Sequence, residues 1–183
     1  MKSYGLIYGL LSAITITLFI ICGVPNENST EDRGVYGNQA QIQIRSPLYT
    51  ELDLAQMLFD AINGERIQRG LPPLVMHRGV ADIAKFRSSD MASRGYFSHS
   101  SPEGETAFSL MDEYGLPYGW AGENLARNNY PNDQSVGIAI HDLMASEGHR
   151  ANILSENYTR LGVSVATDTT GMKYYTMIFT GPP

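Results

Sequence analysis

A hydrophobic segment at the N-terminus determines where the rest of the chain can fold. Between Lys2 and Glu27 the 183-residue sequence has no charged side chain, and residues 4–24 are mainly Leu, Ile, Phe, Gly, Ser and Thr. At about 1.5 Å per helical residue, these 21 residues span roughly the 30 Å hydrocarbon core of a bilayer. A buried helix of this length would normally show a polar face, and this segment has none. The sequence therefore predicts an N-terminal hydrophobic helix in residues 1–24, which acts as a signal anchor or as a signal peptide.

The end of this segment is compatible with three kinds of processing: no cleavage, cleavage or lipidation. A secretory signal should end in small residues, but the segment ends in Phe19-Ile20-Ile21-Cys22-Gly23-Val24, which is a poor cleavage site. Cys22 raises the alternative of lipidation, although bulky isoleucines precede it. An uncleaved anchor is favoured over cleavage and over lipidation, and each of the three places residues 25–183 outside the cytoplasm. The expected location is the cell membrane, with a single span and an extracytoplasmic domain, or alternatively the secreted state.

The cysteine and charge content of residues 25–183 indicates what kind of exported protein they form. Cys22 is the only cysteine, so residues 25–183 can form no intramolecular disulfide, which favours a prokaryotic envelope protein. Residues 25–50 are rich in Asn, Gln, Gly, Ser and Thr, and they are expected to form a flexible linker. The charges of residues 1–50 sum to zero, so the whole net charge of −6 lies in residues 51–183. Nucleic acid is not an expected partner, because a domain this acidic lacks the positive field that binds phosphate backbones.

From residue 51 onward the hydrophobic periodicity predicts helices followed by a small sheet. A spacing of 3.6 residues predicts helices over 51–69, 80–94 and 107–114, and from about Gln134 to the region of His149. After Thr159 the pattern changes: residues 161–166 alternate and residues 173–180 are β-branched and aromatic, which predicts two strands joined by a hairpin turn. A domain of roughly 130 residues can bury enough apolar surface to fold without disulfides, and we expect a soluble monomer. This order predicts an α/β domain that lacks the alternation of a doubly wound sheet.

Few side chains in this domain could carry chemistry. The histidines are His77, His99, His141 and His149. His99 follows the second predicted helix in a loop, and His149 lies at the end of the helix that begins near Gln134. Glu123 follows a glycine-rich turn. His141, in the middle of a helix beside its apolar stripe, is interpreted as a surface or boundary residue.

These residue types support several kinds of chemistry. Two neutral imidazoles, His99 and His149, can bind zinc or another divalent cation, with Glu123 as the strongest candidate for a third ligand. No His-Glu-x-x-His sequence is present, which excludes a metallopeptidase of that kind. Without a metal, Glu123 hydrogen-bonded to a histidine could act as a general base on water. Ser146 could act as a nucleophile with His149 as its base, but no Gly-x-Ser-x-Gly sequence surrounds Ser146. A polar network that only fixes the loops is an equally weighted alternative.

A series of short motifs runs in order along residues 54–181. They are Asn63-Gly64-Glu65-Arg66, Gly70-Leu71-Pro72-Pro73-Leu74, Asp90-Met91-Ala92, Phe97-Ser98-His99, Gly122-Glu123-Asn124-Leu125-Ala126, Ser146-Glu147-Gly148-His149-Arg150-Ala151-Asn152-Ile153-Leu154, Leu161-Gly162-Val163, Tyr174-Tyr175-Thr176 and Phe179. In this order they resemble the CAP superfamily, the SCP-like extracellular domains of cysteine-rich secretory proteins, antigen 5 and plant pathogenesis-related 1 proteins. The absence of cysteine from the domain agrees with the prokaryotic branch. The resemblance implies a three-layer α–β–α sandwich with a small antiparallel sheet between helices.

The resemblance also implies a cleft lined by two histidines and two acidic residues. His99 and His149 match the histidines, and Glu123 matches the first acid. The second acid of the family lies three residues after a tryptophan; here Leu143 takes the tryptophan position, Ser146 the acid position, and Glu147 follows. Because one residue turns a helical side chain by about 100°, the fourth member is Ser146, Glu147 or absent. Met177 is a second departure, where relatives often have glutamine.

Together these features predict an extracytoplasmic, membrane-tethered protein whose CAP-like domain, residues 51–183, contains a His/Glu cleft. The leading hypothesis is a ligand- or metal-binding module. Its expected partners are the membrane, through the N-terminal helix, and an unknown small ligand, lipid or envelope component. The alternatives are a weak hydrolase that acts on peptides or envelope polymers, and a purely structural envelope protein. Whether the protein is an enzyme is left open.

Overall fold

The computed structural model describes residues 49–183. The predicted N-terminal helix, and the predicted linker up to residue 48, lie outside the described residues. Within residues 49–183, no helix combines the length and the apolar character needed to cross a bilayer.

Helices and a single sheet make up the described residues. Their order is α1 (Glu51–Ile67), β1 (Val75–Met76), α2 (Arg78–Arg94), α3 (Ala107–Glu113), β2 (Ala121–Asn128), α4 (Asn132–Ala145), α5 (Glu147–Leu154), β3 (Arg160–Thr167) and β4 (Lys173–Thr180). The strands lie side by side in the order β1-β3-β4-β2. Neighbouring strands pair antiparallel except for the short β1, which runs parallel to β3, so the sheet is mixed at this edge.

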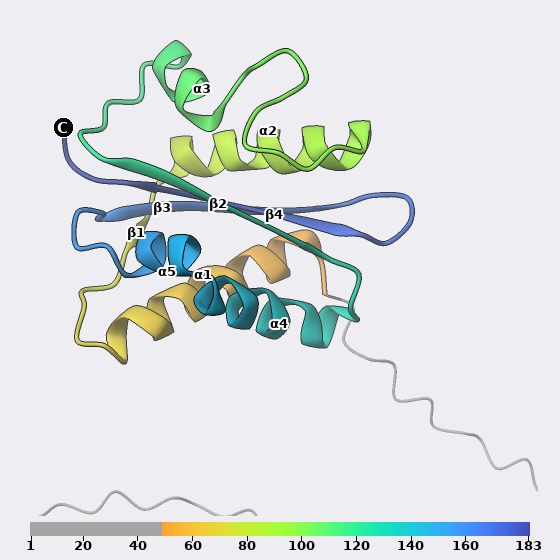
Figure 1. Ribbon diagram of the computed structural model, residues 1–183, viewed down its shortest axis with the longest axis horizontal. Helices are drawn as coiled ribbons and strands as arrows, with labels where there is room; N and C mark the ends of the chain where they lie inside the picture. The colour runs from red at the N-terminus through yellow and green to blue at the C-terminus, as the bar shows by residue number, and fades with distance from the viewer. Residues whose placement is uncertain (1–48) are drawn as a thin grey trace, which may run out of the picture. The chain divides into compact units, whose positions relative to one another are not determined.

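The helices cover both faces of the sheet. In Figure 1, α2 and α3 lie on one face, and α1, α4 and α5 lie on the other. The predicted three-layer α–β–α sandwich is therefore confirmed. The predicted helices at 51–69, 80–94 and 107–114 correspond to α1, α2 and α3, and the predicted hairpin corresponds to β3 and β4.

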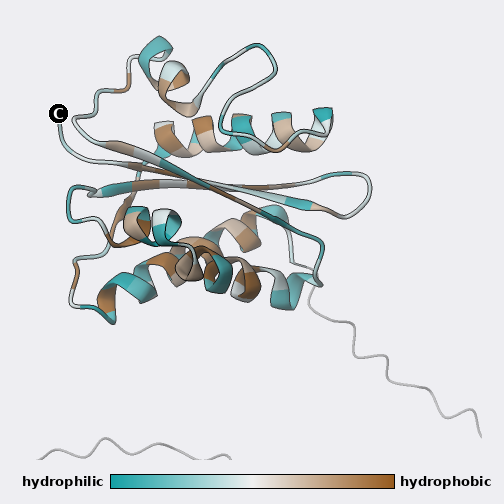
Figure 2. Ribbon diagram, in the orientation of Figure 1, coloured by the Kyte–Doolittle hydropathy of each residue, from teal (hydrophilic) through white to brown (hydrophobic). Residues whose placement is uncertain are grey.

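The core is divided by the sheet into two parts. Successive strand residues point to opposite faces, so Val163 and Phe179 pack with Leu58 in the larger cluster under α1, α4 and α5. Ile178 points the other way, into a cluster with α2 and α3. Figure 2 shows the apolar residues gathered along the strands and in the helical turns beside them. Both faces of the sheet are thus buried, which fixes the direction in which each strand residue points.

Helix α2 lies directly against the sheet. The backbone N–H of Val80 donates to the His77 side chain, which caps the start of the helix, and Gly95 ends the helix in a left-handed conformation with φ 71°. A Cβ at Gly162 would lie 2.4 Å from the Val80 carbonyl carbon. Only glycine therefore allows this approach of α2 to β3, and the approach positions the rest of α2 over the sheet.

The predicted helix from Gln134 to His149 is in fact two helices. Ser146 has an extended backbone, with φ −86° and ψ 124°, and it ends α4 and begins α5. The expected 100° turn between Ser146 and Glu147 assumed one continuous helix, and it does not apply at this break. His149 consequently lies in the first turns of a separate short helix.

Candidate functional site

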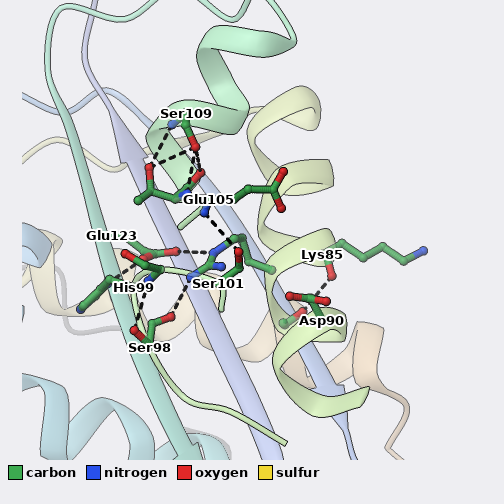
Figure 3. Close-up of polar contacts among 12 residues, drawn as sticks. Lys85, Asp90, Ser98, His99, Ser101, Glu105, Ser109 and Glu123 are labelled. Atoms are coloured by element: carbon green, nitrogen blue, oxygen red, sulfur yellow. Dashed lines mark hydrogen bonds and ion pairs between the residues drawn. The ribbon is translucent and has the colours of Figure 1, made fainter. Parts of the chain in front are cut away.

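A hydrogen bond between His99 and Glu123 forms the centre of the candidate site. His99 Nδ1 lies 2.6 Å from Glu123 Oε2, and Figure 3 shows the two side chains directed toward one another. An ionised carboxylate only accepts hydrogen bonds, so His99 Nδ1 is the donor, and the Nδ1-protonated tautomer of the ring has a lone pair on Nε2. The His99 side chain is 60% exposed, whereas that of Glu123 is 3% exposed. A buried carboxylate thus orients an imidazole that is open to solvent.

The register of β2 explains why Glu123 points toward α2. Glu123 stands opposite Ile178 of β4, and opposed residues of antiparallel strands point to the same face. Ile178 belongs to the α2–α3 side of the core. Asn124, opposite Met177, points to the other face and toward α5. One strand therefore contributes polar side chains to both faces of the sheet.

Arg87 of α2 compensates the charge of Glu123. Its Nε lies 3.5 Å from Glu123 Oε1, its Nη1 donates to Tyr96 Oη at 3.1 Å, and its Nη2 donates to the Ser98 carbonyl at 2.7 Å. The Arg87 side chain is fully buried. A buried carboxylate is costly unless it is paired and hydrogen-bonded, and Arg87 supplies this pairing. The sequence analysis did not identify Arg87 or Tyr96.

Tyr96 connects this pair to Asp90. The Tyr96 hydroxyl donates to Asp90 Oδ2 at 2.6 Å while it accepts from Arg87. Burial and the hydrogen bond to Asp90 raise the pKa of Tyr96 to about 12. The hydroxyl therefore keeps its proton at neutral pH and holds the guanidinium in a fixed position.

The loop between α2 and α3 carries His99 and is tied back to α2. Two guanidinium nitrogens of Arg94 bind the Glu103 carboxylate, at 2.8 and 2.5 Å. The hydrogen bonds from Arg94 lower the pKa of Glu103 to about 2. Within the loop, Ser101 Oγ accepts from the backbone N–H groups of Glu103 and Glu105, at 3.3 and 3.1 Å. Figure 3 shows the contact between Ser101 and Glu105. Together these contacts tie the loop to α2 and to itself.

His149 approaches the site from α5, which is fastened to β2. Asn124 Nδ2 donates to the His149 carbonyl at 2.9 Å, and Asn152 Nδ2 donates to Asn124 Oδ1 at 2.8 Å. Burial, and then the charge of His99, lowers the pKa of His149. The lowered pKa of His149 favours the neutral form of its ring at pH 7.

A cavity of about 270 Å³ lies beside His149, between β2, α4 and the start of α5. Its walls include the apolar side chains of Leu125, Leu143 and Phe97. The Arg127 guanidinium also lines it and lies over the Phe97 ring, 4.9 Å from the ring centroid. The cavity thus offers a small ligand apolar walls, the Arg127 cation and, across from β2, the Asp142 carboxylate of α4.

Ser146 and Glu147, the two candidates for the fourth residue of the cleft, lie in different surroundings. Ser146 lines the cavity beside His149, whereas Glu147 is exposed on the first turn of α5. His141 is 81% exposed and contacts Asp142 at 3.0 Å, so its interpretation as a surface residue is confirmed.

The position of Glu123 bears on its expected role as a third metal ligand. Residues 49–183 contain no cluster of three or more His, Cys, Asp or Glu side chains arranged to hold a metal ion. The two carboxylate oxygens of Glu123 are engaged by Arg87 and His99. This geometry favours Glu123 as the residue that orients His99, rather than as a third metal ligand.

Comparison with known proteins shows what this arrangement resembles. Residues 59–179 match the family described as CAP, the cysteine-rich secretory protein family. The chain is 39% identical over 101 residues to the uncharacterized protein YkwD of Bacillus subtilis, covering 55% of this chain and 38% of that protein. It is 34% identical over 124 residues to the uncharacterized membrane protein YlbC of the same bacterium, covering 68% of this chain and 33% of that protein. The match therefore spans little more than a third of the length of these relatives.

Solved structures of other proteins also match this chain. An extracellular protein containing a SCP domain from Bacillus anthracis is 34% identical, with a TM-score of 0.63, and the match covers 72% of this chain and 41% of that one. An outer surface protein of Borrelia burgdorferi is 14% identical, with a TM-score of 0.65, and the match covers 74% of this chain and 97% of that one. The second likeness shows the fold alone.

Proposed function

We propose that this chain, which belongs to the CAP family of cysteine-rich secretory proteins, is an extracytoplasmic module that binds a divalent metal ion through His99 and His149. Zinc is the cation that we consider first, because neutral imidazoles suit it. The matched protein of Bacillus anthracis is described as extracellular and a matched protein of Bacillus subtilis as a membrane protein, which supports a location outside the cytoplasm. The proposal includes a membrane tether formed by residues 4–24.

The observation that carries the proposal is the hydrogen bond from His99 Nδ1 to the buried Glu123 carboxylate. Histidines that bind zinc usually donate their other ring nitrogen to a carboxylate or a carbonyl, which fixes the tautomer and raises the basicity of the ligating nitrogen. His99 has this arrangement, and its ring is exposed where an ion can reach it. Arg87 holds the carboxylate in place, so His99 is oriented before any ion binds.

His149 supports the same proposal from the other side of the site. Its lowered pKa keeps the ring neutral at pH 7, and only the neutral imidazole can coordinate a cation. A zinc ion held by two histidines keeps positions for water or for a donor group of a ligand. The cavity beside His149 would receive the remainder of that ligand, with an apolar part against Phe97 and an anionic group near Arg127.

The geometry favours binding over hydrolysis by Glu123. A general base must be within hydrogen-bonding reach of the water it activates. Glu123 is 3% exposed, and its oxygens are already engaged by Arg87 and His99. Glu123 is thus poorly placed to activate water, and the main alternative to the metal site is a purely structural network.

Titration calorimetry of the full chain in detergent, with zinc, tests the proposal. We expect one binding event in the native chain, and a loss of at least about tenfold in affinity in His99→Ala and in His149→Ala. Affinity should also fall as the pH drops through about 6.5, because protonated imidazole does not coordinate. His141→Ala is the matched control, since this exposed histidine contacts only Asp142 in the described residues and should leave the affinity unchanged. Equal zinc affinity in all four proteins would overturn the metal site and favour the structural network.

A further inference from the structure

The sheet has an open edge that takes no part in the site of His99 and Glu123. The short strand β1 pairs with β3 only at Arg160 and Leu161. From Gly162 to Thr167, β3 is therefore the edge of the sheet as residues 49–183 form it. This edge lies on the far side of the sheet from β2, the strand that carries Glu123.

The backbone direction of β3 follows from its pairing with β1. The N–H groups of Val75 and His77 donate to the carbonyls of Thr159 and Leu161, at 2.9 and 3.0 Å. Backbone groups alternate in direction along a strand, so every second residue of β3 presents its N–H and C=O groups to the edge. The next residues in this series are 163, 165 and 167.

Two of these three residues have unpaired backbone groups. The N–H of Thr167 donates to the Glu51 carboxylate at 2.6 Å, which confirms that this residue faces the edge. The N–H and C=O groups of Val163 and Val165 have no hydrogen-bond partner within residues 49–183. An open strand edge of this kind is a template for pairing with another strand.

A groove runs along these unpaired groups. It consists of two adjoining cavities of about 390 and 380 Å³, which share Glu51 and Ser89. Its walls come from the start of α1 and from one side of α2. The α2 wall includes the small side chains of Ala81, Ser89 and Ala92 beside the charged Asp82 and Lys85.

We propose that this groove binds an extended peptide, which pairs with β3 at Val163 and Val165 in line with β1. In such recognition the main-chain hydrogen bonds provide affinity, and pockets for alternate side chains provide specificity. The unpaired groups supply the first requirement, and the space beside the small α2 side chains supplies the second. In Figure 3, Lys85 extends from α2 on the side away from His99 and Glu123, so the groove is separate from the metal site.

The charges of the groove indicate the kind of peptide. Glu51, Asp82 and Asp168 line it, against the single cation Lys85. The described domain is acidic as a whole, since the net charge of −6 lies in residues 51–183. We therefore infer a peptide that carries lysine or arginine, which complementary charge would steer to the groove.

Fluorescence anisotropy with the full chain in detergent tests this inference. The probe is a labelled heptapeptide that alternates valine and lysine, with blocked termini. It should bind the native chain, and a peptide that alternates valine and glutamate should bind at least about tenfold more weakly because its charge matches the groove. A valine–lysine peptide that is N-methylated at alternate residues should also bind about tenfold more weakly, because it cannot donate to the carbonyls of β3. Failure of the valine–lysine peptide to bind, or equal binding of all three peptides, would overturn the proposal.

Variants of the chain locate the binding. Ser89→Trp should fill the groove and abolish peptide binding, whereas Gln134→Trp on the exposed start of α4 should leave it unchanged. His99→Ala should bind the peptide normally, which separates this groove from the proposed metal site. Equal binding to Ser89→Trp and the native chain would place the peptide elsewhere and contradict the proposal. If the native chain is a dimer and Ser89→Trp dissociates it, the groove binds a second copy of the chain. This result would also contradict the proposal of a peptide ligand.

Discussion

Glu123 and Arg87 form a charge pair in a part of the molecule that is closed to water. Their side chains are 3% and 0% exposed. Removing one member of such a pair leaves the other buried without compensation, which costs more than replacing both by apolar groups. Arg87→Met is therefore expected to lower the free energy of unfolding by about 3–5 kcal/mol.

Urea denaturation measures this effect. The double variant Arg87→Met with Glu123→Leu is the control, and it should recover part of the lost stability because no buried charge remains. If Arg87→Met alone unfolds at the same urea concentration as the native chain, the pair does not have the role described here.

His149 makes the stability of the domain depend on pH. Burial, and then His99, lowers its pKa in the folded state below the ordinary 6.5, so the unfolded chain takes up a proton more readily. The stability that follows is present above pH 6.5 and is lost as the pH falls through the lowered pKa. Between about pH 7 and about pH 5.5, His149→Gln should therefore lose less stability than the native chain. Urea midpoints at the two pH values measure the difference, and identical losses would refute this reading of His149.

The sequence was sufficient to select His99, Glu123 and His149 as candidates, because their motifs occur in the family's order, and the structure joins the first two by a hydrogen bond. It also contained a signal for Arg87 that the apolar stripe of α2 makes visible: Arg87 falls between Ala84 and Met91 at helical spacing, and all three are buried. A charged residue in an apolar stripe indicates a buried partner. The partner itself could not be identified, since Glu123 is 36 positions away and only the tertiary fold brings the two together.

At the scale of elements, Arg66 fixes α5, and with it His149, relative to α1. The buried Arg66 side chain donates to the carbonyls of Pro72, Ile153 and Ser155, at 3.0, 2.8 and 2.8 Å. Two of these carbonyls lie at the end of α5. The helix that carries His149 therefore depends on a residue that does not contact the proposed ion.

Arg66→Met should consequently lower both stability and zinc affinity. We expect a loss of about 2–4 kcal/mol in unfolding free energy, because one buried and two partly buried carbonyls lose their donor. Hydrogen exchange should also become faster in α5. Arg69→Met is the matched control, because Arg69, just beyond the end of α1, forms an exposed pair with Glu65 of that helix, and it should cost at most about 0.5 kcal/mol. Unchanged exchange in α5 of the Arg66 variant would contradict this role.

The elements that the sequence predicted well are those with a clear periodicity or composition. The helices α1 and α2 have an apolar stripe, β3 alternates, and β4 is rich in β-branched and aromatic residues. Strand β2 was not predicted, because its sequence Ala-Gly-Glu-Asn-Leu-Ala-Arg-Asn lacks the β-branched and aromatic residues typical of strands. Its Glu123 and Asn124 are buried on opposite faces, and their partners come from other parts of the chain: α2 and the loop that follows it for Glu123, and α5 for Asn124. The break between α4 and α5 also escaped prediction. In the structure, the Ser146 side chain forms no hydrogen bond that caps α5.

At the scale of the whole molecule, the two parts of the core share one sheet. Each face of the sheet is covered by helices from residues 49–183, without any disulfide. A fragment of residues 49–183 is therefore expected to fold alone and to remain a monomer. Circular dichroism and sedimentation equilibrium measure these properties. A disordered spectrum, or an aggregated fragment under conditions in which the full chain is folded, would show that the domain depends on preceding residues.

The orientation of His99 by Glu123, ready for an ion, is the central claim, and nitrogen-15 NMR of the histidine rings tests it most directly. Without metal, the spectrum should show His99 protonated at Nδ1, as its 2.6 Å contact with the Glu123 carboxylate requires. On addition of zinc, the Nε2 resonance of His99 and one ring nitrogen of His149 should shift together, while the resonances of His77 and His141 stay in place. A His99 ring protonated at Nε2, or rings of His99 and His149 that do not respond to zinc, would contradict the account.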